Sequence, residues 1–88
     1  MREQGGKHLS LPAVGRAVED IWNEILGVRE GQATATFFEL QGQSISAVRI
    51  AARIEDELGI VVDIGELFED PDRSAFVRQV VAKAAQAQ

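Results

Sequence analysis

Apolar residues recur every three or four positions along three segments of the chain, which is the spacing of amphipathic α-helices. The first segment begins with Ser10 and Pro12, a favourable pair for a helix N-terminus, and ends at Leu26 before Gly27. Its apolar positions share one side of a helix: Val14, Ala17, Val18, Ile21, Trp22, Ile25 and Leu26. The pattern therefore predicts a first helix from Ser10 to Leu26, with Trp22 as a core anchor.

The second amphipathic segment runs from Ser44 to Leu58 and carries more apolar positions than one buried face requires. One arc is sufficient to bury the helix: Ala47, Ile50, Ala51, Ile54 and Leu58. A second stripe of apolar residues turns away from this arc: Ile45, Val48 and Ala52. Arg49 and Arg53 flank the stripe. Either the rest of the chain covers it or it meets a partner, and its position beside Ser44 favours a partner surface.

The remaining segments predict an extended connector, a short helix and a longer last helix. Residues 60–62 are an apolar run without a partner strand, so they pack as a connector. Asp63 caps a short helix that bears three apolar residues: Ile64, Leu67 and Phe68. Pro71 interrupts it, and Asp70 or Asp72 starts the last helix. The apolar face of that helix comprises Phe76, Val77, Val80, Val81 and Ala84.

Residues 27–43 follow neither helical nor alternating periodicity, and so long a connection is unusual between packed helices. One turn is expected over Thr36–Leu40, with Phe37, Phe38 or both pinned to the core. The prediction is an all-α fold, a small four-helix bundle of three longer helices and one short helix with a long first loop. Its predicted parts are a flexible leader at 1–9, the domain at 10–85 and a frayed tail at 86–88.

The inventory of reactive side chains is poor for an enzyme. The 88 residues include no cysteine and one histidine, His8, so the usual nucleophile, base and transition-metal ligands are nearly absent. A net charge of −5 argues against nucleic acid as a partner. No apolar run has the length of a membrane span or resembles a signal peptide. We expect a non-catalytic, cytoplasmic monomer with no metal site and no membrane contact.

The charges are divided unevenly along the chain. The segment from Glu55 to Asp72 contains eight acidic residues and no basic one. In the first half of the second helix, the only charged residues are Arg49 and Arg53. A run of like charges usually forms a solvated face. Next to an apolar stripe, the same distribution is suited to steering and orienting a transient partner.

Ser44 stands where the long loop becomes the second helix, and two interpretations fit it. As a helix cap, a serine contributes ~1 kcal/mol and needs no further role. As an attachment point, it lies where free N–H groups and the helix dipole favour a phosphodiester, and Gly42 leaves room for another enzyme's active site. No internal base is recognisable, so another enzyme would have to modify it. Ser46 is a second hydroxyl but lies inside the helix.

The stretch FFELQGQSI, residues 37–45, resembles the phosphopantetheine attachment motif of carrier proteins, most closely that of peptidyl and aryl carrier domains of nonribosomal peptide synthetases. The usual pattern is a pair of aromatic or apolar residues, Leu-Gly-Gly, a polar residue, Ser, and Leu or Ile. The order of the predicted helices, the long loop and the connector also matches. The resemblance implies an acyl carrier protein-like bundle in which Ser44 bears 4′-phosphopantetheine, whose thiol holds an aminoacyl, aryl or peptidyl group.

This sequence departs from the pattern at two positions. Gln41 replaces the first glycine, and Gln43 replaces the Asp, His or Asn common before the serine, which leaves open the transferase that accepts it. The arginines after Ser44 favour the peptide-synthetase type, because carriers of fatty-acid synthases have a more acidic recognition helix.

The resemblance also implies partners and a surface that meets them. The partners are a phosphopantetheinyl transferase, an adenylating enzyme, and condensation, thioesterase or tailoring enzymes. The predicted partner-binding residues lie around the motif and on the two following helices: Gly42, Gln43, Ile45, Val48, Arg49, Ala52, Leu67 and Phe68. Two alternatives stay open. One is a carrier of polyketide or fatty-acid synthesis, and the other is a helical interaction module in which Ser44 only caps a helix.

Overall fold

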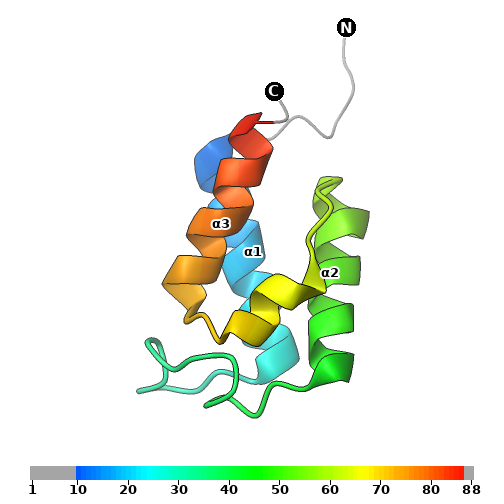
Figure 1. The fold of residues 1–88 in the computed structure, drawn as a ribbon. Helices are drawn as coiled ribbons and strands as arrows, with labels where there is room; N and C mark the ends of the chain where they lie inside the picture. Colours follow the sequence, from blue (N-terminus) through cyan, green and yellow to red (C-terminus); the bar gives the residue numbers. More distant parts are fainter. Residues whose placement is uncertain (1–9, 87–88) are drawn as a thin grey trace, which may run out of the picture.

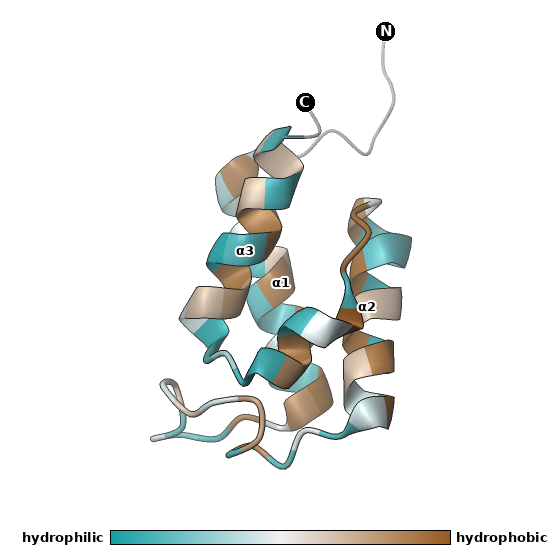
Figure 2. Cartoon of the chain, in the orientation of Figure 1, coloured by the Kyte–Doolittle hydropathy of each residue, from teal (hydrophilic) through white to brown (hydrophobic). Residues whose placement is uncertain are grey.

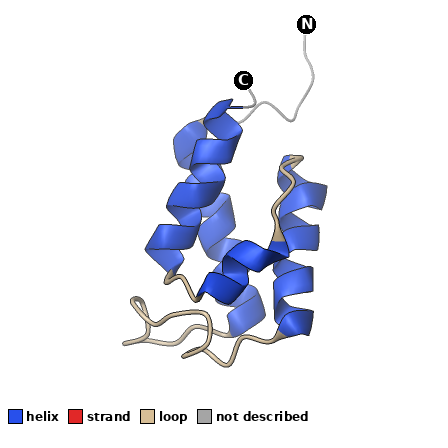
Figure 3. Ribbon diagram, viewed as in Figure 1, coloured by secondary structure: helices blue, strands red, loops and turns tan. Residues whose placement is uncertain are grey.

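The computed structural model describes residues 10–86, which form three α-helices and one short 3₁₀ helix. In chain order these are α1 (Leu11–Leu26), α2 (Ser44–Leu58), η1 (Ile64–Glu69) and α3 (Arg73–Gln86) (Figure 1). Helix α1 packs against both α2 and α3, and η1 contacts α2. Within residues 10–86 there is no strand, and the long loop lies across one end of the bundle (Figure 3). The predicted all-α bundle is confirmed.

Helix α1 begins and ends as its sequence predicts. The Ser10 hydroxyl accepts a hydrogen bond from the Ala13 N–H at 3.2 Å, which satisfies one of the free donors of the first turn. At the other end Gly27 has φ 63°, a left-handed conformation that glycine adopts without steric cost. The N–H groups of Gly27 and Val28 both return to the Asn23 carbonyl. These two ends fix where the long loop starts.

The core is built around three aromatic rings from different parts of the chain. Trp22 of α1 lies between Phe37 of the loop and Phe76 of α3, with ring centroids 6.2 and 5.6 Å away. All three side chains are almost completely buried, so the predicted role of Trp22 as a core anchor is confirmed. Each helix carries both apolar and polar residues along its length (Figure 2), as expected for helices that bury one side in the core. In residues 10–86 no helix combines the length and apolarity that crossing a membrane requires.

The part of the chain after α2 also follows the prediction, with two refinements. Val62 of the extended connector is buried, whereas Val61 is exposed. Asp63 caps η1 by accepting a hydrogen bond from the Gly65 N–H at 2.9 Å. Asp72, not Asp70, caps α3, because its carboxylate accepts from the Ala75 N–H at 2.8 Å.

Of the leader and the tail predicted at the two ends of the domain, the structure describes one residue, Gln86. Helix α3 extends to Gln86, the first residue of the predicted tail. The predicted leader, with His8, and residues 87–88 lie outside the described residues.

Candidate functional site

The loop segment before α2 folds into one turn closed by reciprocal hydrogen bonds. The Thr36 N–H donates to Glu39 Oε1 at 2.9 Å, and the Glu39 N–H donates to Thr36 Oγ1 at 3.2 Å. Backbone bonds continue the turn, from the Leu40 N–H to the Thr36 carbonyl and from the Gly42 N–H to the Phe37 carbonyl. The turn predicted at Thr36–Leu40 is therefore present, and it leads directly into the start of α2.

The two adjacent phenylalanines of this turn have different environments. Phe37 is completely buried and packs against Trp22 and Phe68, each with its ring centroid at 6.2 Å. Phe38 leaves about half of its side chain exposed, at 48%. Phe37 therefore anchors the loop to the core, and Phe38 contributes exposed apolar surface to the loop that precedes α2.

Ser44 is the first residue of α2, and it does not cap the helix. The N-cap residue is Gln43, in extended conformation at φ −138° and ψ 175°, and it makes no side-chain cap hydrogen bond. The Ser44 side chain is exposed, and its hydroxyl forms no hydrogen bond with any other residue of the range 10–86. The predicted capping role is therefore wrong, because the helix begins one residue too early for it.

The local electrostatics at Ser44 suit an anion. The first turn of any α-helix presents backbone N–H groups without intrahelical acceptors, and the first turn of α2 contains no acidic side chain. The helix dipole adds a partial positive charge at this end. A phosphodiester on Ser44 would meet unused donors and no neighbouring carboxylate in that turn, so the site fits the group that the motif implies.

Gly42 has a structural role that the sequence did not reveal. A Cβ atom at this position would lie 2.6 Å from three ring carbons of Phe37, which is closer than real side-chain contacts. The buried Phe37 ring thus occupies the space beside the Gly42 Cα. Glycine is required here for packing inside the loop, which is a different reason from the predicted access for another enzyme.

Gln41 adopts a backbone conformation that explains the glycine usual in the motif. Its φ is 68°, in the left-handed region where a side chain costs about 1–2 kcal/mol. A glycine at this position would avoid the strain. The departure from the Leu-Gly-Gly pattern therefore has a conformational cost in the loop that presents Ser44.

Replacing Gln41 by glycine is expected to stabilise the protein by about 0.5–1 kcal/mol, because relief of the left-handed strain exceeds the added entropy of the unfolded chain. Urea unfolding measures this change, and the melting temperature should rise by roughly 2–8 °C. Gln41→Ala is the matched control, since alanine also removes the glutamine side chain but keeps a Cβ atom in the left-handed conformation and so gains no strain relief. Equal effects of the two substitutions would contradict the explanation.

The apolar stripe on α2 lies on the surface. Ile45 is 66% exposed and Val48 is 51% exposed, and Ala52 is exposed as well. No other described part of the chain covers the stripe, so the alternative in which the loop or η1 buries it is wrong. Phe68 of η1 is also partly exposed. Leu67 is completely buried in the core and cannot contribute its side chain to a partner surface, which corrects that prediction.

Three more exposed apolar residues escaped the sequence reasoning: Phe38, Val61 and Ile64. For Val61 a signal existed, because side chains alternate between two faces in an extended segment and the neighbouring Val62 is buried. For Phe38 there was none, since either member of the Phe37–Phe38 pair satisfies the same pattern.

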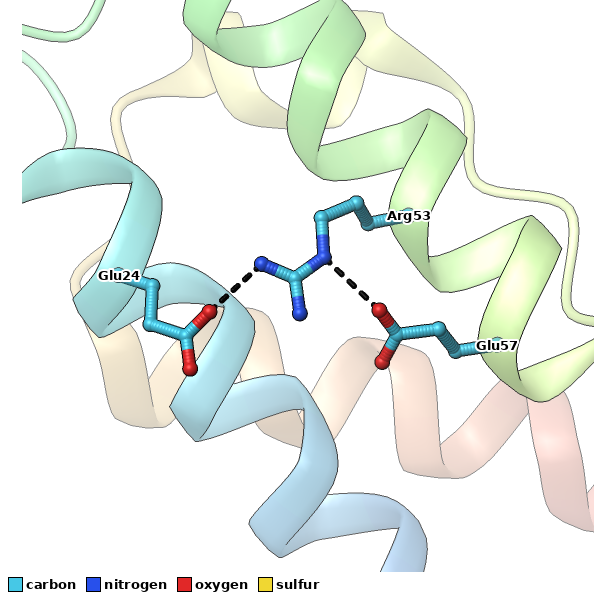
Figure 4. Close-up of polar contacts among 3 residues, drawn as sticks. All are labelled: Glu24, Arg53 and Glu57. Carbon is cyan, nitrogen blue, oxygen red and sulfur yellow. Dashed lines mark hydrogen bonds and ion pairs between the residues drawn. The ribbon is translucent and has the colours of Figure 1, made fainter.

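The two arginines that follow Ser44 differ in their contacts. Arg53 bridges α1 and α2: its Nη1 lies 2.7 Å from Glu24 Oε1, and its Nε lies 2.9 Å from Glu57 Oε2 (Figure 4). The hydrogen bond that Arg53 donates to Glu24, followed by the one it donates to Glu57, raises the pKa of Arg53. Arg49 is exposed and forms no ion pair with another residue of the described range. Among residues 10–86, Arg49 is therefore the cation that lies beside the stripe without an ion pair.

Comparisons with known proteins agree with this geometry. The family model described as phosphopantetheine attachment site matches residues 16–80. Phosphinothricin tripeptide synthetase PhsC of Streptomyces viridochromogenes is 34% identical over 93% of this chain, and malpinin synthetase of Mortierella alpina is 38% identical over 83%. Surfactin synthase subunit 3 of Bacillus subtilis is 41% identical over 61% of the chain.

The chain spans only a small part of these relatives, 8%, 1% and 4% of their respective lengths. It is thus similar to one segment of each much longer protein, and the resemblance to carrier domains of nonribosomal peptide synthetases is confirmed. The family model covers most of the described helices, from α1 through α3. The chain belongs to the phosphopantetheine attachment site family, whose members carry covalently attached 4′-phosphopantetheine.

Proposed function

We propose that Ser44 is the residue that bears 4′-phosphopantetheine and that the domain acts as a carrier in nonribosomal peptide synthesis. The observation that supports this best is the state of the serine itself. Ser44 is exposed at the first position of α2, and its hydroxyl serves no hydrogen bond within residues 10–86. Ser44 has no structural task and occupies the position of the serine in the family motif, so it is suited to modification.

The residues around Ser44 explain how the domain takes part without being a catalyst. No side chain among residues 10–86 is hydrogen-bonded to the Ser44 hydroxyl, so the base that accepts its proton comes from the transferase. The free N–H groups at the start of α2 would favour the negative charge of a phosphodiester on Ser44. The bound group supplies a terminal thiol that holds an aminoacyl, aryl or peptidyl unit as a thioester.

The proposed partners are those of a carrier. A phosphopantetheinyl transferase modifies the domain in the cytoplasm, an adenylating enzyme loads it, and condensation, thioesterase or tailoring enzymes receive its cargo. Tethering keeps the cargo at high effective concentration at each docked active site. The proposed docking surface consists of the α2 stripe, Arg49 and Phe68, with Gln43 next to the modified serine.

Intact mass spectrometry tests the modification directly. The purified apo protein is incubated with coenzyme A, magnesium and a broadly tolerant phosphopantetheinyl transferase. The expected result is the transfer of one phosphopantetheinyl group to the whole population, in which the serine oxygen replaces adenosine 3′,5′-bisphosphate on the phosphorus of coenzyme A. An unchanged mass, alongside a control carrier that is modified, would leave a helical interaction module as the function.

The cargo class is tested by offering the modified protein to two kinds of loading enzyme. We expect thioester formation with adenylating enzymes that activate amino or aryl acids, and none with acyltransferases that deliver malonyl units. The relative that matches most of this chain's length among those compared above is named as a tripeptide synthetase, which supports this choice. Loading by the acyltransferase alone would favour a carrier of polyketide or fatty-acid synthesis.

Val48→Asp is expected to lower the kcat/KM for loading by a partner enzyme about tenfold without unfolding the bundle. Val48 is half exposed, so its replacement removes apolar contact area and adds a charge at the interface while the core stays intact. Circular dichroism and a loading assay measure the two properties. Ala82→Asp adds the same charge on α3 and should leave loading unchanged. An unfolded Val48→Asp variant would place Val48 in the core and contradict the proposal.

A further inference from the structure

The turn that presents Ser44 is fastened to the junction between η1 and α3, far away in the sequence. The Phe37 N–H donates to the Pro71 carbonyl at 2.9 Å, and the Phe38 N–H donates to Asp70 Oδ1 at 2.9 Å. Thr36 and Asp72 form an isolated antiparallel bridge beside these bonds. Of these contacts only the hydrogen bond from the Phe38 N–H is accepted by a side chain, that of Asp70, so it is the one that depends on residue identity.

Asp70 holds this position in a left-handed backbone conformation, at φ 63° and ψ 51°. It terminates η1, and its own N–H returns to the Leu67 carbonyl at 3.2 Å. Glycine is the residue that adopts this conformation without strain. A strained residue whose side chain accepts a hydrogen bond from the loop combines two tasks, ending η1 and holding the turn.

The hydrogen bond that Asp70 accepts from Phe38 lies close to Ser44 along the backbone. The Phe38 N–H is bonded to Asp70, and the Phe38 carbonyl accepts from the Gln41 N–H at 3.0 Å. Gly42 is bonded to the Phe37 carbonyl at 2.8 Å, and α2 begins two residues later. The peptide group between Phe37 and Phe38 therefore makes both the bond to Asp70 and the bond to Gly42. Its orientation determines the path of the segment that ends at Ser44. It also determines the direction of the exposed Phe38 ring.

We infer that Asp70 is a positioning residue for the modification of Ser44: its carboxylate fixes the Thr36–Gly42 turn in the arrangement that the transferase meets. The inference rests on the proposed function, because it concerns the rate at which Ser44 is modified. The carboxylate touches neither Ser44 nor the incoming group. It acts through the backbone of the turn.

The experiment compares Asp70→Gly, Asp70→Asn and Asp72→Ala with the wild type in the transferase reaction with coenzyme A. Asp70→Gly relieves the backbone strain and removes the acceptor, so the fold survives while the turn is released. We expect its kcat/KM to fall about tenfold, the cost of one lost charge-assisted hydrogen bond. Asp70→Asn keeps an acceptor oxygen at the same place and should retain a rate within about threefold of wild type.

Asp72→Ala separates positioning from stability. It removes the cap of α3 and lowers the melting temperature, but it leaves the bond between Asp70 and Phe38 in place. Its kcat/KM should stay near that of the wild type at temperatures where it is folded. Amide hydrogen exchange supplies a second readout: Asp70→Gly should accelerate exchange at Phe38 and Gly42 and leave the α1 amides protected.

The outcomes distinguish the two proposals. An unmodified wild-type protein would overturn the proposed function and this inference with it. A wild type that is modified normally, together with a folded Asp70→Gly variant of equal kcat/KM, would overturn only the positioning role. Equal losses in Asp70→Gly and Asp72→Ala would also overturn it, because the effect would then follow stability alone.

Discussion

Ser44→Ala should abolish the addition of phosphopantetheine and leave the stability of the domain almost unchanged. The first result follows because the transferred group needs the hydroxyl oxygen as its point of attachment. The second follows because the Ser44 hydroxyl caps nothing: α2 starts at Ser44, and its N-cap is Gln43. Alanine is the best helix former, so the change in unfolding free energy should stay within about 0.5 kcal/mol.

Two measurements check the prediction, and Ser46→Ala is the matched control. Intact mass after incubation with coenzyme A and the transferase reports modification, and urea unfolding reports stability. Ser46 lies two residues into α2 and is partly buried, so its alanine variant should still gain one group. Modification of Ser44→Ala, or its absence in Ser46→Ala, would place the attachment elsewhere. A stability loss of ~1 kcal/mol in Ser44→Ala would restore the capping role.

The helices could be predicted because each carries its own local signals. For α1 these were the Ser10 cap, the glycine stop at Gly27 and an apolar stripe of helical period, and the structure has all three. The short η1 was recognised from Asp63 before it and Pro71 after it. Such signals depend on neighbouring residues in the chain, so one sequence is sufficient to identify them.

The contacts that shape the loop could not be predicted, because they join residues distant in sequence. The hydrogen bond between Phe38 and Asp70 spans 32 positions, and no local sequence feature at either residue predicts it. The burial of Phe37 and the exposure of Phe38 are likewise decided by which ring reaches Trp22. Leu67 and Phe68 posed the same problem: both are apolar, and only packing against the bundle shows that Leu67 is the buried one.

The candidate site was located by its motif, but its geometry differed from expectation. A serine at the start of a helical segment is by pattern an N-cap, but Ser44 is the first helical residue of α2 and Gln43 before it occupies the N-cap position. The sequence alone likewise does not show why residue 42 is a glycine. The reason becomes clear only from the position of the Phe37 ring beside it. The type of site was therefore evident from the sequence, whereas the reasons for its individual residues were structural.

Phe37→Ala should cost about 3–5 kcal/mol of stability, a large share of the roughly 5–15 kcal/mol that holds a domain folded. The Phe37 ring is fully buried between Trp22 and Phe68, so its removal leaves a cavity where the loop meets the core. Urea unfolding measures the loss, and the melting temperature should fall by more than about 12 °C. Phe38→Ala is the matched control on the adjacent ring, with a smaller expected loss of about 1–1.5 kcal/mol, because only about half of the Phe38 side chain is buried.

A double-mutant cycle with Gly42→Ala shows whether Phe37 also dictates the glycine before Ser44. In the wild type the new methyl group meets the Phe37 ring, so Gly42→Ala should cost about 1–3 kcal/mol. In the Phe37→Ala background the ring is absent and the same substitution should cost almost nothing. The coupling energy would then reach at least about 1 kcal/mol. Equal costs in both backgrounds would mean that glycine is needed at this position for a reason other than its contact with Phe37.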